Sequence, residues 1–261
     1  MLNALAHAYR SECVKTLRAR VLVPLLAGTG AVAAAAAAIM VALTHAPAAG
    51  GHAAAASVSG GMLKPLQTAT SVLCLVLMAV AATSFTHEYR YGTWRNLLVR
   101  LPHRPSLLAG KAAGLVALAA LVALTACLAT GATAWITASV RGLDTSPWTS
   151  ASGWFSSASA AARVLAALAA GTLYGAAAGL LLRSTGAALS VVFAWILVGE
   201  SVVTGLTAAR GWTVAAWLPG SSLTHLASDA HWAPAALSAA LWCAVCTAGS
   251  VWHFNRTTRL G

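Results

Sequence analysis

The chain has 261 residues, of which 59% are apolar and 8% are charged, and its 16 basic and 5 acidic side chains give a formal net charge of +11. Soluble domains carry about 25% charged residues, so the composition excludes an ordinary soluble domain if the apolar residues lie in long runs. The basic excess raises the alternative of nucleic-acid binding. The positions of the basic residues decide between these two interpretations.

Six long apolar segments are present, and a helix of about 20 such residues spans the hydrocarbon core of a bilayer. They are residues 21–44, 66–86, 112–140, 164–182, 187–207 and 234–252. The alternating ten-residue segments of an outer-membrane barrel are absent from the sequence. We therefore predict an all-α integral membrane protein, with six transmembrane helices in a single domain over residues 1–261.

The basic residues are distributed unevenly between the loops that these spans would leave. If the N-terminus is cytoplasmic, twelve of the sixteen fall inside, and the four outside are Lys64, Arg141, Arg163 and Arg210. This bias follows the positive-inside rule and predicts that both termini are cytoplasmic. The positive charge thus reports topology, and no nucleic-acid partner is expected. The first span is too long for a signal-peptide core, so we expect it to be retained.

The arm before the first span, residues 1–20, places Leu2, Leu5, Tyr9, Cys13 and Leu17 at helical spacing with basic residues between them. This pattern is typical of an interfacial helix with its apolar side toward lipid. The alternative is an ordinary basic flank of the first span.

The longest predicted cytoplasmic segment runs from Thr86 to Lys111. Within it, a short amphipathic run from Thr93 to Leu101 lies between Gly92 and Pro102. A loop that only connects two helices can be much shorter, so we expect this segment to contact a partner.

Three further features lie in the second half of the chain. Glu200 is the one acid deep in an apolar run, and it either bonds to a neighbouring helix as a neutral group or lines a pathway. Residues 208–233 are too apolar for a free loop and are interrupted by Pro and Gly, which favours short re-entrant helices over a flexible loop with aromatic anchors. Small residues at Gly171, Gly175 and Gly179 predict close helix packing.

Motifs for catalysis are missing from the sequence. Gly110-Lys111 is followed by Ala112, so it does not form a phosphate-binding loop, and Tyr91 stands where H-E-x-x-H would need its second His. Cys243 and Cys246 have redox spacing but lie in an apolar run with no basic neighbour. We expect no catalytic residue, no metal and no cofactor on this chain.

Three segments together resemble the membrane subunit of an ABC-2 type exporter, in the six-helix form found in actinobacteria. The first, Ser11 to Arg20, is similar to the family's S-E-x-x-K-L-R-S-x-R opening, with Thr16 inserted. The second, Phe85 to Thr93 with Pro102, Arg104 and Lys111, is similar to its E-Y-R-x-G-T, P-x-R and K segment. The third, Trp217-Leu218-Pro219, is similar to its W-L-P approach to the last span.

The resemblance implies an export permease in the bacterial inner membrane that lacks its own ATPase. Its partners would be the lipid bilayer, an ABC ATP-binding subunit that holds ATP and Mg, and a second permease, either the same chain as a homodimer or a paralogue. A connecting helix would include Glu12, Lys15 and Arg18. A coupling helix at about residues 88–105 would present Glu88, Tyr89, Gly92, Thr93, Arg95, Leu98 and Arg104 to the ATPase.

Other classes of function are less well supported by the residues. A stand-alone membrane enzyme or immunity protein would need the catalytic motifs that are missing, and a purely structural membrane subunit is a third reading. The spans are rich in Ala, Leu and Val, which favours an amphipathic or lipid-like cargo over an ion or a sugar. Drugs, antimicrobial peptides and lipids all remain open as substrates.

Overall fold

The computed structural model describes residues 9, 18–43, 62–94, 104–210, 212, 214, 217–228 and 232–257. These residues form helices and no strand. Six of the helical segments are long and apolar enough to cross a membrane. The prediction of an all-helical membrane protein with six spans is therefore confirmed.

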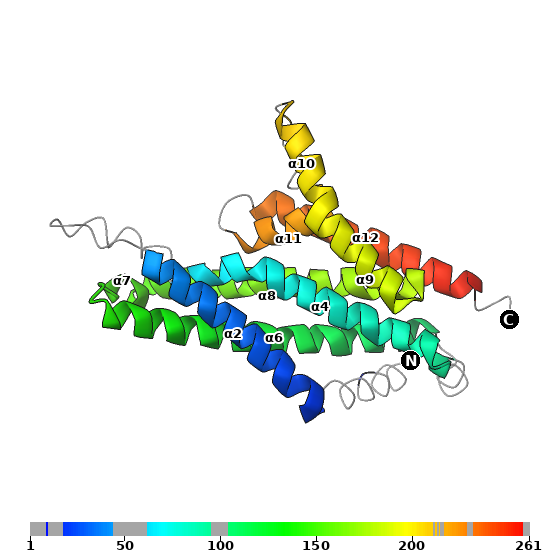
Figure 1. Ribbon diagram of the computed structural model, residues 1–261, viewed down its shortest axis with the longest axis horizontal. Coiled ribbons are helices and arrows are strands. Elements are labelled where there is room, and N and C mark those ends of the chain that lie inside the picture. The colour runs from blue at the N-terminus through cyan, green and yellow to red at the C-terminus, as the bar shows by residue number, and fades with distance from the viewer. Residues whose placement is uncertain are drawn as a thin grey trace.

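The six spans are numbered along the chain as in Figure 1. Five of them are single helices: α2 (Ala19–Leu43), α4 (Lys64–Arg90), α6 (Arg104–Val140), α8 (Ala151–Leu182) and α12 (Trp232–Thr257). The fifth span along the chain is one continuous helix made of α9 (Thr185–Phe193), η1 (Ala194–Gly199) and α10 (Glu200–Ala208). Two short helices, α7 (Ser146–Thr149) and α11 (Pro219–Ala227), precede α8 and α12.

Two spans begin well before the apolar runs that predicted them. Helix α6 starts at Arg104 rather than 112, and α8 starts at Ala151 rather than 164. The start of α8 is fixed by Ser150, whose hydroxyl accepts a hydrogen bond from the Gly153 N–H at 3.1 Å. A cap of this kind depends on one polar side chain, so hydropathy alone does not locate it.

Helix α8 is the centre of the bundle and contacts α4, α6, α11 and α12, while α2 packs on α6 and α4 (Figure 1). The α4–α8 interface is very close because two glycines of α8 face the α4 backbone. A Cβ on Gly175 would lie 2.2 Å from the carbonyl oxygen of Met78, and one on Gly179 would lie 2.6 Å from that of Ala82. Small residues thus bring the two helices into backbone contact.

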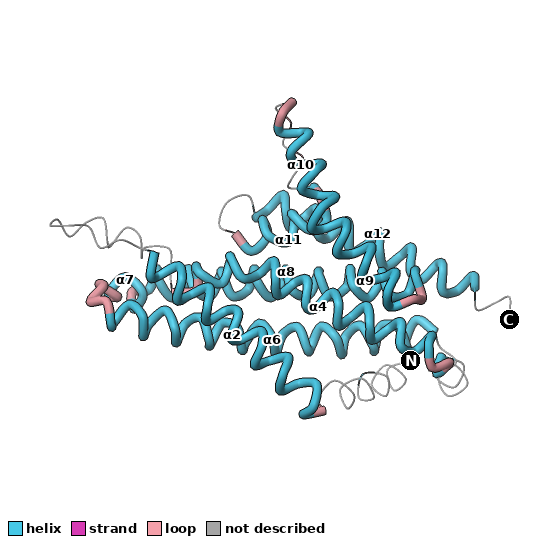
Figure 2. The backbone as a smooth tube through the Cα atoms, in the orientation of Figure 1, coloured by secondary structure: helices cyan, strands magenta, loops and turns pink. Residues whose placement is uncertain are grey.

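The fifth span leaves the bundle instead of running alongside it. Its first part, α9, packs on α4 and α8, and the helix then continues through the π-helical turn η1 into α10, which points away from the other spans (Figure 2). Helix α11 lies between η1, α4, α8 and α12. This divergence creates the space in which the site of the next subsection is found.

Candidate functional site

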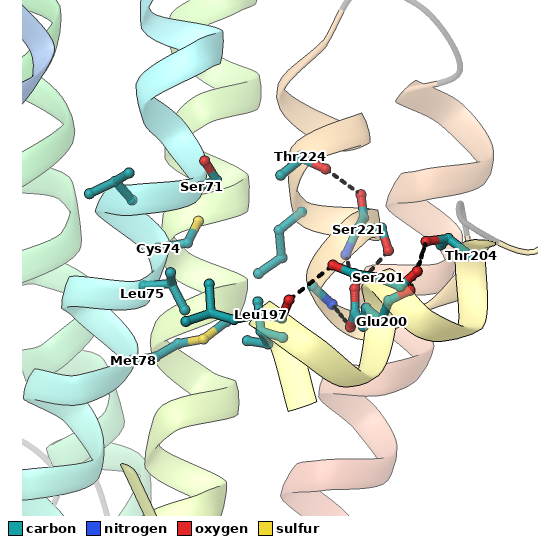
Figure 3. Close-up of a pocket in the computed structure, with 14 residues that line it drawn as sticks. Ser71, Cys74, Leu75, Met78, Leu197, Glu200, Ser201, Thr204, Ser221 and Thr224 are labelled. Atoms are coloured by element: carbon teal, nitrogen blue, oxygen red, sulfur yellow. Dashed lines mark hydrogen bonds between the residues drawn. The ribbon is translucent and has the colours of Figure 1, made fainter. Parts of the chain in front are cut away.

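Glu200 is the first residue of α10, directly after η1, and only 4% of its surface is exposed. Its carboxylate accepts hydrogen bonds from the backbone N–H groups of Gly220 at 2.5 Å and Ser221 at 2.6 Å, and from the Ser221 hydroxyl at 2.7 Å. Figure 3 shows the carboxylate reaching the first turn of α11. Glu200 thereby ties the fifth span to the short helix before the sixth.

The sequence of α11 explains why the carboxylate binds there. The first N–H groups of a helix have no partner within the helix, and the helix dipole favours negative charge at this end. Pro219 begins the helix, and Gly220 lets the acid approach, because a Cβ on Gly220 would lie 2.9 Å from Oε2 of Glu200. Both carboxyl oxygens accept backbone N–H groups, which is the arrangement of an ionised carboxylate.

Beside Glu200 lies a cavity of about 370 Å³ between α4, the η1–α10 segment and α11. Figure 3 shows Ser71, Cys74, Leu75 and Met78 of α4 on one side of it and the fifth span on the other. The lining combines apolar side chains with the Glu200 carboxylate and several hydroxyl groups. The π-helical turn supplies Ile196 and Leu197 to the wall, and such turns occur frequently at functional sites.

A second polar cluster lies at the far end of α4, where the chain enters the predicted coupling segment. Glu88 and Lys111 are 6% and 4% exposed, and the Lys111 Nζ lies 3.3 Å from Oε1 of Glu88. The Thr93 hydroxyl donates to the other carboxylate oxygen of Glu88, and Lys111 also lies 5.1 Å from the centre of the Phe85 ring. A buried pair of this kind fixes the end of α4 against the start of α6.

Trp94 follows this ion pair and is itself buried, at 6% exposure. Its ring centre lies 5.6 Å from that of Tyr89, 6.3 Å from that of Phe85 and 5.0 Å from that of Phe254 on α12. Trp94, the residue just before the predicted coupling segment, is therefore packed against both α4 and α12.

The link between α8 and α9 closes the same end of the bundle. Arg183 has a left-handed backbone with φ of 55°, its guanidinium lies 5.3 Å from the centre of the Tyr89 ring, and its Nη2 lies 3.3 Å from Nε2 of His253. The Thr86 and Thr185 hydroxyl oxygens are 2.7 Å apart. Side chains from α4, α6, α9, α12 and the link between α8 and α9 thus meet in one cluster.

The structure brings together only some of the residues that the sequence singled out. Glu88, Tyr89 and Thr93 meet in this cluster, and Gly92 makes the turn before Thr93 with φ of +63°, which glycine adopts readily. Glu200 lies apart, in the cavity beside α11. Gly171, Gly175 and Gly179 face α4.

Other predicted site residues carry no structural description. Glu12 and Lys15 lie outside the described residues, as do Arg95 and Leu98 and most of the predicted interfacial helix. Arg18 is exposed just before α2, and Arg104 is the first residue of α6. The sequence pattern did not single out Trp94 or Arg183. For Trp94, an aromatic residue directly after Gly92-Thr93 is a signal that could have indicated a packed position.

The architecture defines the class of protein: a multi-pass helical membrane protein with a largely apolar cavity beside its fifth span, into which one buried carboxylate projects. The model of a family described as ABC-2 family transporter protein matches residues 9–174. No curated protein and no solved structure matches the chain. Because the family match covers more than half of the sequence, the chain belongs to the ABC-2 transporter family, and the resemblance noted from the sequence is confirmed. It is a membrane transport subunit of the permease type.

Proposed function

We propose that this chain is the membrane subunit of an ABC-2 type exporter in a bacterial inner membrane, with both termini in the cytoplasm. It moves an amphipathic or lipid-like substrate outward, using ATP that a separate subunit binds with Mg and hydrolyses. A second permease, a copy or a paralogue, completes the transport unit. The family match is the observation that carries this proposal.

The buried cluster around Glu88 supports a coupling role for the segment that follows it. An ATPase can shift a membrane bundle only through an element that makes different contacts in two states. Residues 95–103 lie between Trp94, which packs on α12, and the start of α6, which carries Lys111. A force on this segment would therefore act on α4, α6 and α12 together.

In this proposal another subunit supplies the energy for transport. Its sequence contains no phosphate-binding loop, since Ala112 follows Gly110-Lys111. The cavity beside Glu200 lies between the fifth span and α4, where a tilt of the diverging α10 would change its shape. In this proposal Glu200 lines part of the route that the substrate takes.

The experiment is a pull-down of the tagged chain from detergent-solubilised membranes of its host, with mass spectrometry and an ATPase assay on the eluate. The double variant Arg95→Glu/Leu98→Glu should insert normally but lose the ATP-binding subunit and the ATPase activity. The charge reversal Arg210→Glu, in a predicted outside loop, is the matched control and should retain both. Unchanged co-purification of the double variant, or a lone wild-type chain without ATPase, would overturn the proposal.

A further inference from the structure

We infer that the cavity beside Glu200 binds an amphipathic cation, a molecule with an ammonium or guanidinium group on an apolar body. The inference deepens the proposed function, because it names the chemical class of cargo that this cavity accepts. Three observations carry it: a buried carboxylate that has no ion-pair partner among the described residues, four hydroxyl groups that already donate their protons, and an apolar wall formed by α4.

Within the described part of the chain, the charge of Glu200 is stabilised by dipoles. No Lys, Arg or His of the described part of the chain forms an ion pair with it, and no residue that lines the cavity is basic. Its hydrogen bonds come from the start of α11, which carries only a partial positive charge. A full cation in the cavity would therefore meet an uncompensated negative charge in a medium of low dielectric constant, where the attraction is stronger than in water.

The hydroxyl groups of the lining reinforce this preference. Ser201 donates to the Leu197 carbonyl at 2.9 Å, Thr204 to the Glu200 carbonyl at 2.8 Å and Thr224 to the Ser221 carbonyl at 2.8 Å. A hydroxyl has one proton to donate and two lone pairs. Each of these groups has used its proton within its own helix, so it offers only lone pairs to a ligand. The Ser221 hydroxyl likewise donates to Glu200.

The ligand that fits such a lining is a hydrogen-bond donor with positive charge. Ammonium and guanidinium groups donate and do not accept, whereas an anion would be repelled by the Glu200 carboxylate and would meet the lone pairs of these hydroxyls. The remaining wall is apolar, through Cys74, Leu75, Met78, Ile196, Leu197 and Leu223. A volume of about 370 Å³ is at the small end of ligand pockets and admits a cationic group with a short apolar body.

Binding can be measured on the purified chain in lipid nanodiscs, without any ATP-binding subunit. The probe is radiolabelled n-decylammonium in equilibrium dialysis, with empty nanodiscs to correct for partition into lipid and with n-decanol and n-decyl sulfate as matched neutral and anionic probes. We expect saturable binding of the ammonium, at least about tenfold tighter than that of either matched probe. Equal affinities for decylammonium and decanol would overturn the inference.

Two variants separate the charge from the shape of the cavity. Glu200→Gln should weaken decylammonium binding by about tenfold or more and leave decanol binding unchanged. Leu75→Trp fills the cavity from α4 and should abolish ammonium binding although Glu200 is still present. The control Leu124→Trp, at an exposed position of α6 outside the cavity, should leave ammonium binding unchanged. If Glu200→Gln does not fold, Leu75→Trp carries the test, and wild-type binding by either variant would overturn the inference.

The two proposals fail in different ways. Loss of ammonium selectivity in the isolated chain would remove the cargo class and leave the co-purification result intact. A chain that binds the ammonium but purifies without an ATPase would retain this site and lose the exporter function.

Discussion

A methyl group added at Gly175 should separate the two central helices of the bundle. In Gly175→Ala the new Cβ would lie 2.2 Å from the Met78 carbonyl oxygen and 2.6 Å from its Cα. These are backbone atoms of α4, so no side chain can rotate away. The helices must retreat by roughly 0.8 Å to reach even 3.0 Å, below which Cβ atoms essentially never approach another atom.

The cost follows from the interface that moves. A radial gap of about 0.5 to 1 Å forfeits a quarter to a half of each dispersion contact, and overpacking of a well-packed core typically costs about 1 to 3 kcal/mol. Gly→Ala in a helix also gains about 0.5 to 1 kcal/mol from backbone entropy. Gly205→Ala, which has nothing within 4 Å, shares that gain without the clash and isolates the steric part.

The assay is unfolding of the purified protein by SDS in mixed micelles, followed by tryptophan fluorescence. We expect Gly175→Ala to be less stable than Gly205→Ala by about 1 to 3 kcal/mol. Gly171→Ala, on the same helix face but with its nearest neighbour at 3.4 Å, should lie close to the control. Equal stabilities of Gly175→Ala and Gly171→Ala would refute the reasoning from backbone contact.

Two further predictions concern charged groups. Glu88→Gln should destabilise the protein by about 3 to 5 kcal/mol, because it leaves the buried Lys111 without its carboxylate. The double variant with Lys111→Met should cost less than the sum of the single changes in the same titration, and additive costs would contradict the pairing. The Ser146 N–H and hydroxyl donate hydrogen bonds to Asp144 and hold the pKa of this carboxyl below its usual range. The ionised Asp144 therefore stabilises the fold above the unfolded-state pKa, and this contribution is lost as the pH falls through the native pKa. Ser146→Ala should raise that pKa in an NMR titration, and an unchanged value would contradict the assignment.

The number and nature of the spans could be predicted because an apolar run of about 20 residues is a property of local composition. The starts of α6 and α8 could not, because such ends depend on single caps and on packing. Ser150 starts α8 within a stretch that hydropathy assigns to a loop. The end of α8 at Leu182 does coincide with the end of the apolar run, although the left-handed residue that follows it is Arg183 and not glycine.

In the candidate sites, too, single residues could be predicted from the sequence but their contacts could not. A motif in one short segment placed Glu88 near Thr93, but their contact with Lys111 and the packing of Trp94 on Phe254 depend on helices that meet only in the folded bundle. Glu200 stood out from the sequence as an isolated acid. Its partners at α11 include backbone N–H groups, which no side-chain pattern reveals.

The ion pair between Glu88 and Lys111 also bears on how this chain enters a bilayer. Burying an ionised side chain in a membrane helix bundle is costly, and pairing it with an opposite charge offsets part of the cost. Glu88 lies near the end of α4 and Lys111 near the beginning of α6, so the ion pair between them forms only when the two helices are packed together. Biogenesis of the bundle therefore favours the release of α4 and α6 into lipid as a pair rather than one at a time.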